Sequence, residues 1–219
     1  GEEVKSKFVY RLKQEIETRG TLDVLRKGLS DYGSRFQLVY FAPESSLNPD
    51  HALAYQNNIF SLIRQVKFSQ KDEKSLDTVI FINGLPISTL ELKNYFTGQN
   101  VQNAIKQYRY DRDPREALFA FKRCLVHFAV DNDLVYMTTR LAGKSTFFLP
   151  FNKGFENGAG NPLNPSGFKS AYLWEEVLQK ESLLQILAEF MLVAVERTTD
   201  EEGNEKEKET LIFPRYHQL

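Results

Sequence analysis

Residues 76–93 read L-D-T-V-I-F-I-N-G-L-P-I-S-T-L-E-L-K, two apolar runs separated by Asn83-Gly84. Asn-Gly between two such runs is the strongest short-range signal for a β-hairpin. A loop at positions 83–85 would pair position 82 with position 86 and, counting outward, Asp77 with Glu91. Directly opposed side chains have Cβ atoms about 5 Å apart. The stretch therefore predicts two carboxylates facing each other on one side of a sheet.

Two negative charges at that spacing repel each other unless a cation lies between them. Magnesium is bound through one or two carboxylates together with waters and substrate phosphate oxygens. Side chains alternate along a strand, so Lys93 shares the face of Glu91 while Leu92 points into the core. An ammonium beside the ion can orient an attacking water and screen developing charge. The pattern favours metal-assisted phosphodiester hydrolysis with Asp77, Glu91 and Lys93 as catalytic residues.

A simpler interpretation is an acid pair that is merely solvated at a hairpin edge. Both acids, however, lie inside strongly apolar strands, where unpaired charges are costly. That context favours the functional interpretation.

The rest of the chain alternates between helical and strand periodicity. It predicts an α/β fold with a central mixed β-sheet flanked by helices. Helices are expected at 2–19, 21–28, 99–112, 115–121, 172–179 and 181–195. Strands are expected at 35–41, 58–68, 76–82, 86–93, 124–130, 134–140 and 147–151. Residues 197–210 contain no apolar residue and are expected to form a solvated loop or linker, whereas 211–219 is apolar again and is expected to begin a further domain.

Composition excludes several classes of protein. The 219 residues carry a net charge of −1, so DNA contacts must come from local patches or from partner subunits. One cysteine, Cys124, excludes a disulfide framework, and three histidines leave too few ligands for a Cys/His zinc site. No signal peptide or membrane-spanning stretch is evident, so a cytoplasmic location without membrane contact is expected.

Several blocks together resemble one known family. The hairpin sequence, Asn103 to Gln107 followed by Tyr110, and the stretches 125–140, 148–154 and 213–218 occur in the order of that family. They resemble the nuclease domain of the R (restriction) subunit of type I restriction–modification enzymes, within the PD-(D/E)xK nuclease superfamily. The resemblance covers roughly residues 60–219. It implies a PD-(D/E)xK restriction-endonuclease-like core.

The resemblance also implies roles for individual residues. Asp77 and Glu91 would hold Mg²⁺, or Mn²⁺ in its place, with the backbone carbonyl of Leu92 as a third ligand. Lys93 would be the catalytic lysine. Gln218 would contact the adenine of ATP, which only the full-length protein would use.

Gln107 and Tyr110 would support DNA binding and cleavage. Arg109 and Arg112 lie in the basic stretch 106–123, which could follow DNA phosphates or form a solvated helix balanced by acids. This sequence departs from the family pattern in having Asp111 at the place of the tyrosine. The family's further acid on the first helix has three candidates that the sequence does not separate, Glu3, Glu15 and Glu17.

The sequence thus predicts an endonuclease domain at 1–196, a charged linker at 197–210 and the start of an ATP-driven motor at 211–219. Double-stranded DNA and the methyltransferase and specificity subunits would be its partners. Gly143-Lys144-Ser145 resembles a phosphate-binding loop, but Thr138 replaces its first glycine, so this stretch should not hydrolyse ATP. Two alternatives stay open, a DNA-repair or resolvase nuclease of the same superfamily and a non-catalytic docking module.

Overall fold

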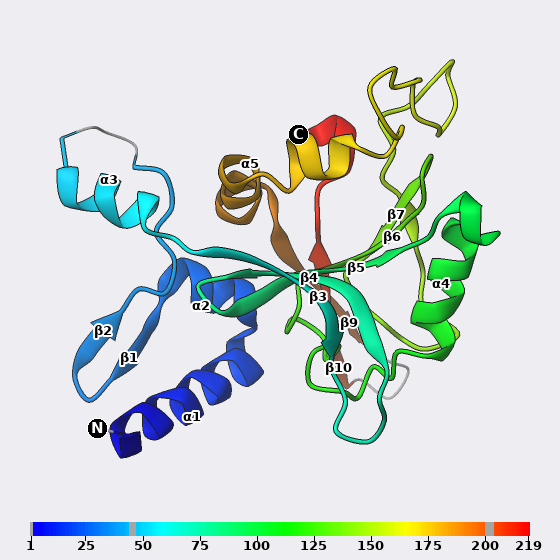
Figure 1. Cartoon of the computed structure of the whole chain (residues 1–219). Coiled ribbons are helices and arrows are strands. Elements are labelled where there is room, and N and C mark those ends of the chain that lie inside the picture. The colour runs from blue at the N-terminus through cyan, green and yellow to red at the C-terminus, as the bar shows by residue number, and fades with distance from the viewer. Residues whose placement is uncertain (1, 44–46, 200–203) are drawn as a thin grey trace.

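A computed structural model describes residues 2–43, 47–199 and 204–219. Its centre is a six-stranded sheet in the order β3-β4-β5-β6-β7-β8 (Figure 1). The strands are β3 (Phe60–Lys67), β4 (Ser75–Ile82), β5 (Leu85–Leu92), β6 (Val126–Val130), β7 (Val135–Thr138) and β8 (Leu149–Pro150). β5 and β6 are parallel and the other neighbours are antiparallel. The predicted α/β class with a mixed central sheet is confirmed.

The β4–β5 hairpin has a tighter turn than predicted. Ile82 pairs with Leu85, and Asn83 and Gly84 adopt φ angles of 49° and 83°. Positive φ at both central residues is the turn that Asn-Gly favours, because it matches the twist of the two strands. The predicted three-residue loop is therefore wrong.

A bulge corrects the offset that the tighter turn introduces. The register shifts between Ile80 and Phe81, so that Thr78 pairs with Leu90. This is the offset that the longer loop would have given. Asp77 and Glu91 are the next residues outward from that pair.

Apolar side chains fill both faces of the sheet. On one face, helix α4 (Val101–Tyr110) packs Ile105 and Tyr108 with Val79 of β4. On the other face, α2 (Thr21–Lys27), α5 (Lys180–Gln185) and the π-helical turns η2 (Leu173–Val177) and η3 (Ile186–Phe190) cover the sheet. Within the described residues no helix has the length and apolar character needed to cross a membrane.

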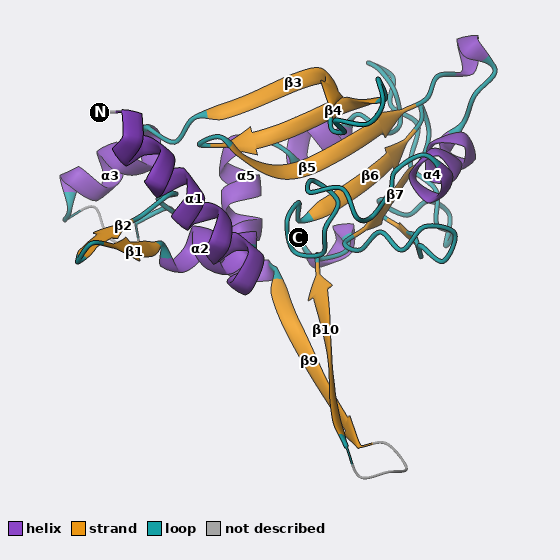
Figure 2. Ribbon diagram, turned by 90° about the horizontal axis from the view of Figure 1, so that it is seen from below, coloured by secondary structure: helices purple, strands orange, loops and turns teal. Residues whose placement is uncertain are grey.

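The N-terminal elements form one end of the molecule (Figure 2). α1 (Glu2–Arg19) and α2 agree with the predicted helices, although only Ile16 of α1 is buried. The strand predicted at 35–41 is limited to β2 (Ser34–Phe36), paired with β1 (Leu29–Asp31). Helix α3 (Pro49–Gln56) was not predicted, although Asn48 accepts a bond from the His51 N–H and Pro49 opens the helix, the usual signals for a helix start.

Two further helix predictions are corrected. Residues 115–121 form turns, and the helix expected through position 195 ends at Phe190, where Met191 turns extended. β9 (Leu192–Thr199) and β10 (Glu205–Ile212) then form a two-stranded ribbon that extends away from the body (Figure 2). The described parts of the expected linker 197–210 belong to this ribbon, and residues 200–203 lie outside the described residues.

Residues after the ribbon pack onto the body of the fold. Phe213 is 4% exposed, and its ring centroid lies 5.8 Å from those of both Phe128 and Phe151. The short turn η4 (Tyr216–Gln218) follows, with the Tyr216 ring 5.0 Å from that of Tyr172. The segment predicted to start a further domain thus contributes side chains to the core of this one.

Candidate active site

Asp77 lies in β4, beside the end of its hairpin partner β5. Its Oδ2 accepts a hydrogen bond of 2.8 Å from the backbone N–H of Leu92. The Lys93 ammonium lies 3.9 Å from the same oxygen. The side chain of Asp77 is 26% exposed, so one side of this carboxylate remains open to solvent.

Glu91 lies on the same side of the sheet and is fully buried. Both Nε and Nη2 of Arg112 contact its Oε1, at 2.7 Å and 2.6 Å. Its Oε2 is also buried and accepts no hydrogen bond from any described residue. A buried carboxylate oxygen without a partner is costly, so it is an unused ligand position.

Burial, more than any neighbour, sets the protonation of Glu91. Desolvation raises the pKa of its carboxyl to about 8, and the negative charge of Asp77 acts in the same direction. Arg112 and Lys93 lower the pKa but do not cancel the effect of burial. Strong perturbation of a carboxyl beside other charged groups is typical of functional sites.

Arg112 is held inside the protein. Its side chain is only 2% exposed, donates a 2.9 Å bond to the Ser75 carbonyl, and lies 5.1 Å from the Phe68 ring centroid. The sequence suggested a DNA contact for Arg112. The structure instead places its guanidinium against Glu91, where it cannot reach a DNA phosphate without leaving that carboxylate.

A buried polar chain lies behind the carboxylates. Thr89 Oγ1 is within hydrogen-bond distance of Tyr108 Oη at 2.8 Å and of His127 Nδ1 at 2.7 Å. Burial raises the pKa of Tyr108 well above its ordinary value, so its phenol stays neutral. Sequence reasoning did not identify Tyr108, because an apolar helix face offers no signal for a single buried hydroxyl.

Burial lowers the pKa of His127 to about 3, compared with 6.5 for an exposed imidazole. Below pH 6.5 the imidazole of His127 therefore takes up a proton in the unfolded chain but stays neutral in the folded chain. The stability that neutral His127 contributes is fully present above pH 6.5 and is lost toward pH 3. We expect this loss to approach about 1.4 kcal/mol per pH unit.

The comparison of wild type with His127→Gln isolates this effect in chemical unfolding curves at several pH values. The comparison is needed because Glu91 acts in the opposite direction. Its folded pKa is raised, so its contribution is present below pH 4.5 and is lost as the pH rises through about 8. A stability difference between the two proteins that does not change from pH 6.5 to pH 4 would contradict a buried neutral His127.

The other predicted DNA-contacting residues lie on or just beyond α4. Tyr110 is 58% exposed, with the Lys144 ammonium 5.8 Å from its ring centroid. Arg109 donates a 3.1 Å bond to the Thr146 carbonyl, and Gln107 is partly buried. No hydrogen bond in the described part of the chain joins Gln107 or Tyr110 to the carboxylate pair. Their roles in DNA binding stay predictions.

Gln218 lies in η4, where its Oε1 accepts a 2.7 Å bond from the Arg215 N–H. The predicted contact with adenine is not tested by this arrangement. Of the three first-helix acids, Glu15 is the least exposed and pairs with Arg11 and Arg19 at 2.7 Å and 2.8 Å. Glu3 and Glu17 pair with lysines of α1.

The donor set suits a hard divalent cation. Glu91 Oε2 is an orphaned acceptor, and Asp77 Oδ1 has only a long 3.4 Å contact from Gln65. The described residues contain no cluster of three or more His, Cys, Asp or Glu side chains. Magnesium does not require one, because waters, a backbone carbonyl and a phosphate oxygen complete its octahedral shell. The residues present therefore fit such an ion.

Two comparisons relate this chain to known proteins. The family model described as the type I restriction enzyme R protein N terminus matches residues 47–146, which include both carboxylates and the lysine. A protein of Methanocaldococcus jannaschii, described as "Putative type I restriction enzyme MjaVIIIP endonuclease subunit", is 26% identical over 234 aligned residues. The alignment covers 99% of this chain but 19% of that protein, so the chain spans about a fifth of its relative. The resemblance seen in the sequence is confirmed.

Proposed function

Because residues 47–146 match the N terminus of type I restriction R proteins, we propose that this chain is the Mg²⁺-dependent endonuclease module of such a subunit. Its reaction would be hydrolysis of phosphodiester bonds in double-stranded DNA. The observation that carries the proposal is the unpartnered Glu91 Oε2, buried on the same sheet face as Asp77 and Lys93.

Each side chain has a distinct task in that reaction. Asp77 and Glu91 would hold the ion, with the Leu92 carbonyl as a third ligand. When bound, a divalent cation lowers the pKa of a coordinated water and neutralises charge on the phosphoryl group. Lys93 would place its ammonium where negative charge develops on the phosphate. The Leu92 N–H fixes the direction of the Asp77 carboxylate through its 2.8 Å bond.

Arg112 acts as a positioning residue in this account. Its two contacts to Glu91 Oε1 leave Oε2 as the oxygen that can bind an ion. The same contacts offset part of the cost of burying a carboxylate.

The relative is about five times as long as this chain, so a wider activity belongs to the proposal. We propose that cleavage is coupled to ATP-driven translocation, with Gln218 contacting adenine and with methyltransferase and specificity subunits as partners. Since those parts would deliver the DNA, the module alone is expected to cleave weakly or not at all. One observation favours the alternative of a non-catalytic docking module, namely that Arg112 already bonds to Glu91.

Metal binding distinguishes the endonuclease function from the function of a non-catalytic docking module. We expect this chain to bind Mn²⁺ in electron paramagnetic resonance titrations, and Asp77→Ala and Glu91→Ala to lose that binding. Asp113→Ala is the control, because this acid pairs with Arg115 at the surface and takes no part in the site. Equal Mn²⁺ binding by wild type and both site variants would support the docking function instead.

A further inference from the structure

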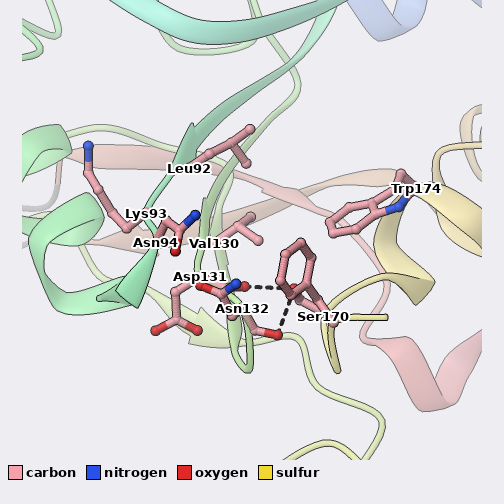
Figure 3. Close-up of a pocket in the computed structure, with 9 residues that line it drawn as sticks. Leu92, Lys93, Asn94, Val130, Asp131, Asn132, Ser170 and Trp174 are labelled. Atoms are coloured by element: carbon pink, nitrogen blue, oxygen red, sulfur yellow. Dashed lines mark hydrogen bonds between the residues drawn. The ribbon is translucent and has the colours of Figure 1, made fainter. Parts of the chain in front are cut away.

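A small cavity opens at the carboxyl ends of the two parallel strands, next to Lys93 (Figure 3). Its volume is about 200 Å³, and it is lined by residues that follow β5 and β6 and by two aromatic side chains, Phe168 and Trp174. Ligands of α/β sheets commonly bind at the carboxyl ends of parallel strands. We propose that this cavity holds an unstacked nucleobase of the DNA strand that is cut, a subsite that rests on the proposed nuclease function.

The cavity and the carboxylates lie on opposite sides of one strand end. Leu92 and Lys93 both line the cavity, whereas Glu91 bonds to Arg112 and the Lys93 ammonium lies near Asp77. In Figure 3 the Lys93 ammonium points away from Trp174, in keeping with its 3.9 Å contact to Asp77. A strand crossing this sheet edge would place a phosphate beside Lys93 and a neighbouring base above Leu92.

Two aromatic rings are held ready for stacking. Phe168 and Trp174 are 48% and 39% exposed, so both rings are accessible from solvent. Their backbone is anchored by Ser170, whose buried hydroxyl donates a 2.6 Å bond to the Asp131 carbonyl. Trp174 lies in η2, and π-helical turns are frequent at functional sites. Stacking of a base on an aromatic ring is tolerant of sequence.

The polar groups of the cavity suit a base. Asn94 and Asn132 use their carbonyl oxygens to accept bonds from the N–H groups of Phe96 and Tyr95. Neither carboxamide nitrogen donates to another described residue, so both remain available for acceptors on a base edge. The acid in the lining, Asp131, is held by the protein itself, because its oxygens accept bonds from three backbone N–H groups, those of Val101, Asp133 and Leu134.

The sequence supplies a direct probe, because Trp174 is the only tryptophan of the chain. We would titrate this chain with a short single-stranded oligonucleotide in EDTA and follow tryptophan emission. Stacking should quench the emission. An oligonucleotide of the same length in which every base is replaced by an abasic site should not quench it, although it carries the same phosphates. Equal quenching by both, or quenching by neither, would overturn the proposal.

Variants then measure the contribution of the second ring. Phe168→Ala is expected to weaken base-dependent quenching by about 5- to 150-fold in affinity, the range measured for one stacked base. Phe155→Ala is the matched control, because Phe155 is also 48% exposed and does not line the cavity. If Phe168→Ala folds poorly, Asn94→Ala provides a second variant. It should weaken quenching by the intact oligonucleotide and leave the signal with the abasic oligonucleotide unchanged.

The base site and the nuclease function can fail separately in these experiments. Quenching without any DNA cleavage by the full-length enzyme would retain the base site and reject the nuclease function. If Phe168→Ala left cleavage unchanged and no base-dependent quenching were seen, the base site would be rejected and the nuclease function retained.

Discussion

On the proposed nuclease function, Lys93→Ala in the full-length, assembled protein is expected to lower the rate of DNA cleavage by about 10²–10³-fold, the usual loss when one preorganised donor is removed from a reaction centre. The reason is its position. The ammonium lies 3.9 Å from Asp77 Oδ2, and its side chain is only 11% exposed, so water cannot easily replace it. ATP turnover should be unchanged, because the substitution lies outside the motor. Cleavage is measured on circular DNA and ATP hydrolysis in the same reaction.

A matched control keeps this result interpretable. Lys71→Ala removes a lysine whose side chain is 77% exposed and lies 3.6 Å from Glu116, so it should cleave at the wild-type rate. Loss of ATP turnover together with cleavage in Lys93→Ala would indicate a defect of assembly. Full cleavage by Lys93→Ala would remove the lysine from the reaction.

Arg112→Ala is expected to destabilise the fold by about 3–5 kcal/mol, the cost of removing one partner from a buried ion pair. The variant leaves Glu91 without its two hydrogen bonds and the Ser75 carbonyl without a donor. It also removes the cation that lies against the Phe68 ring. Chemical unfolding of wild type and variant measures the difference.

Arg115→Ala serves as the comparison, since Arg115 is 86% exposed and its pair with Asp113 lies at the surface. Its stability should hardly change, because exposed ion pairs contribute little. If Arg112→Ala were as stable as wild type and only bound DNA less well, Arg112 would be the DNA-contacting residue that its place in a basic stretch suggested.

The hairpin shows why the site could be predicted although its details could not. Asn83-Gly84 and the apolar runs predicted two paired strands, and alternation placed Asp77 and Glu91 on one face. The turn closed one residue earlier than expected, and a bulge at Ile80 and Phe81 restored the offset. The bulge has no local sequence signal. Two deviations that cancel thus leave Asp77 and Glu91 as the next residues outward from the pair of Thr78 and Leu90.

Arg112 shows the limit of local patterns. Its neighbours in sequence are charged and mostly exposed, so the sequence favoured a surface role, yet its side chain is 2% exposed. The contact that buries it comes from Glu91 on a strand 21 positions earlier in the chain. A signal was available, however. A carboxylate inside an apolar strand requires a buried cation, and the basic stretch after α4 was the nearest source.

The C-terminal ribbon illustrates the same limit for secondary structure. Residues 192–195 continue an apolar helical pattern, and 197–210 carries no apolar side chain, so a helix and then a linker were expected. Instead β9 and β10 pair along their full length, from Leu192 with Ile212 to Thr199 with Glu205. The pairing satisfies the backbone even where the side chains stay exposed, and side-chain periodicity carries no information about such a ribbon.

The central claim is that Asp77 and Glu91 hold one divalent ion beside Lys93. Crystals soaked in Mn²⁺ test it most directly through anomalous diffraction near the manganese absorption edge. The account predicts a single strong peak within coordination distance of Glu91 Oε2 and of an Asp77 carboxylate oxygen, and no peak there in Glu91→Gln crystals. A strong Mn²⁺ peak elsewhere, with Glu91 Oε2 still unligated, would contradict it.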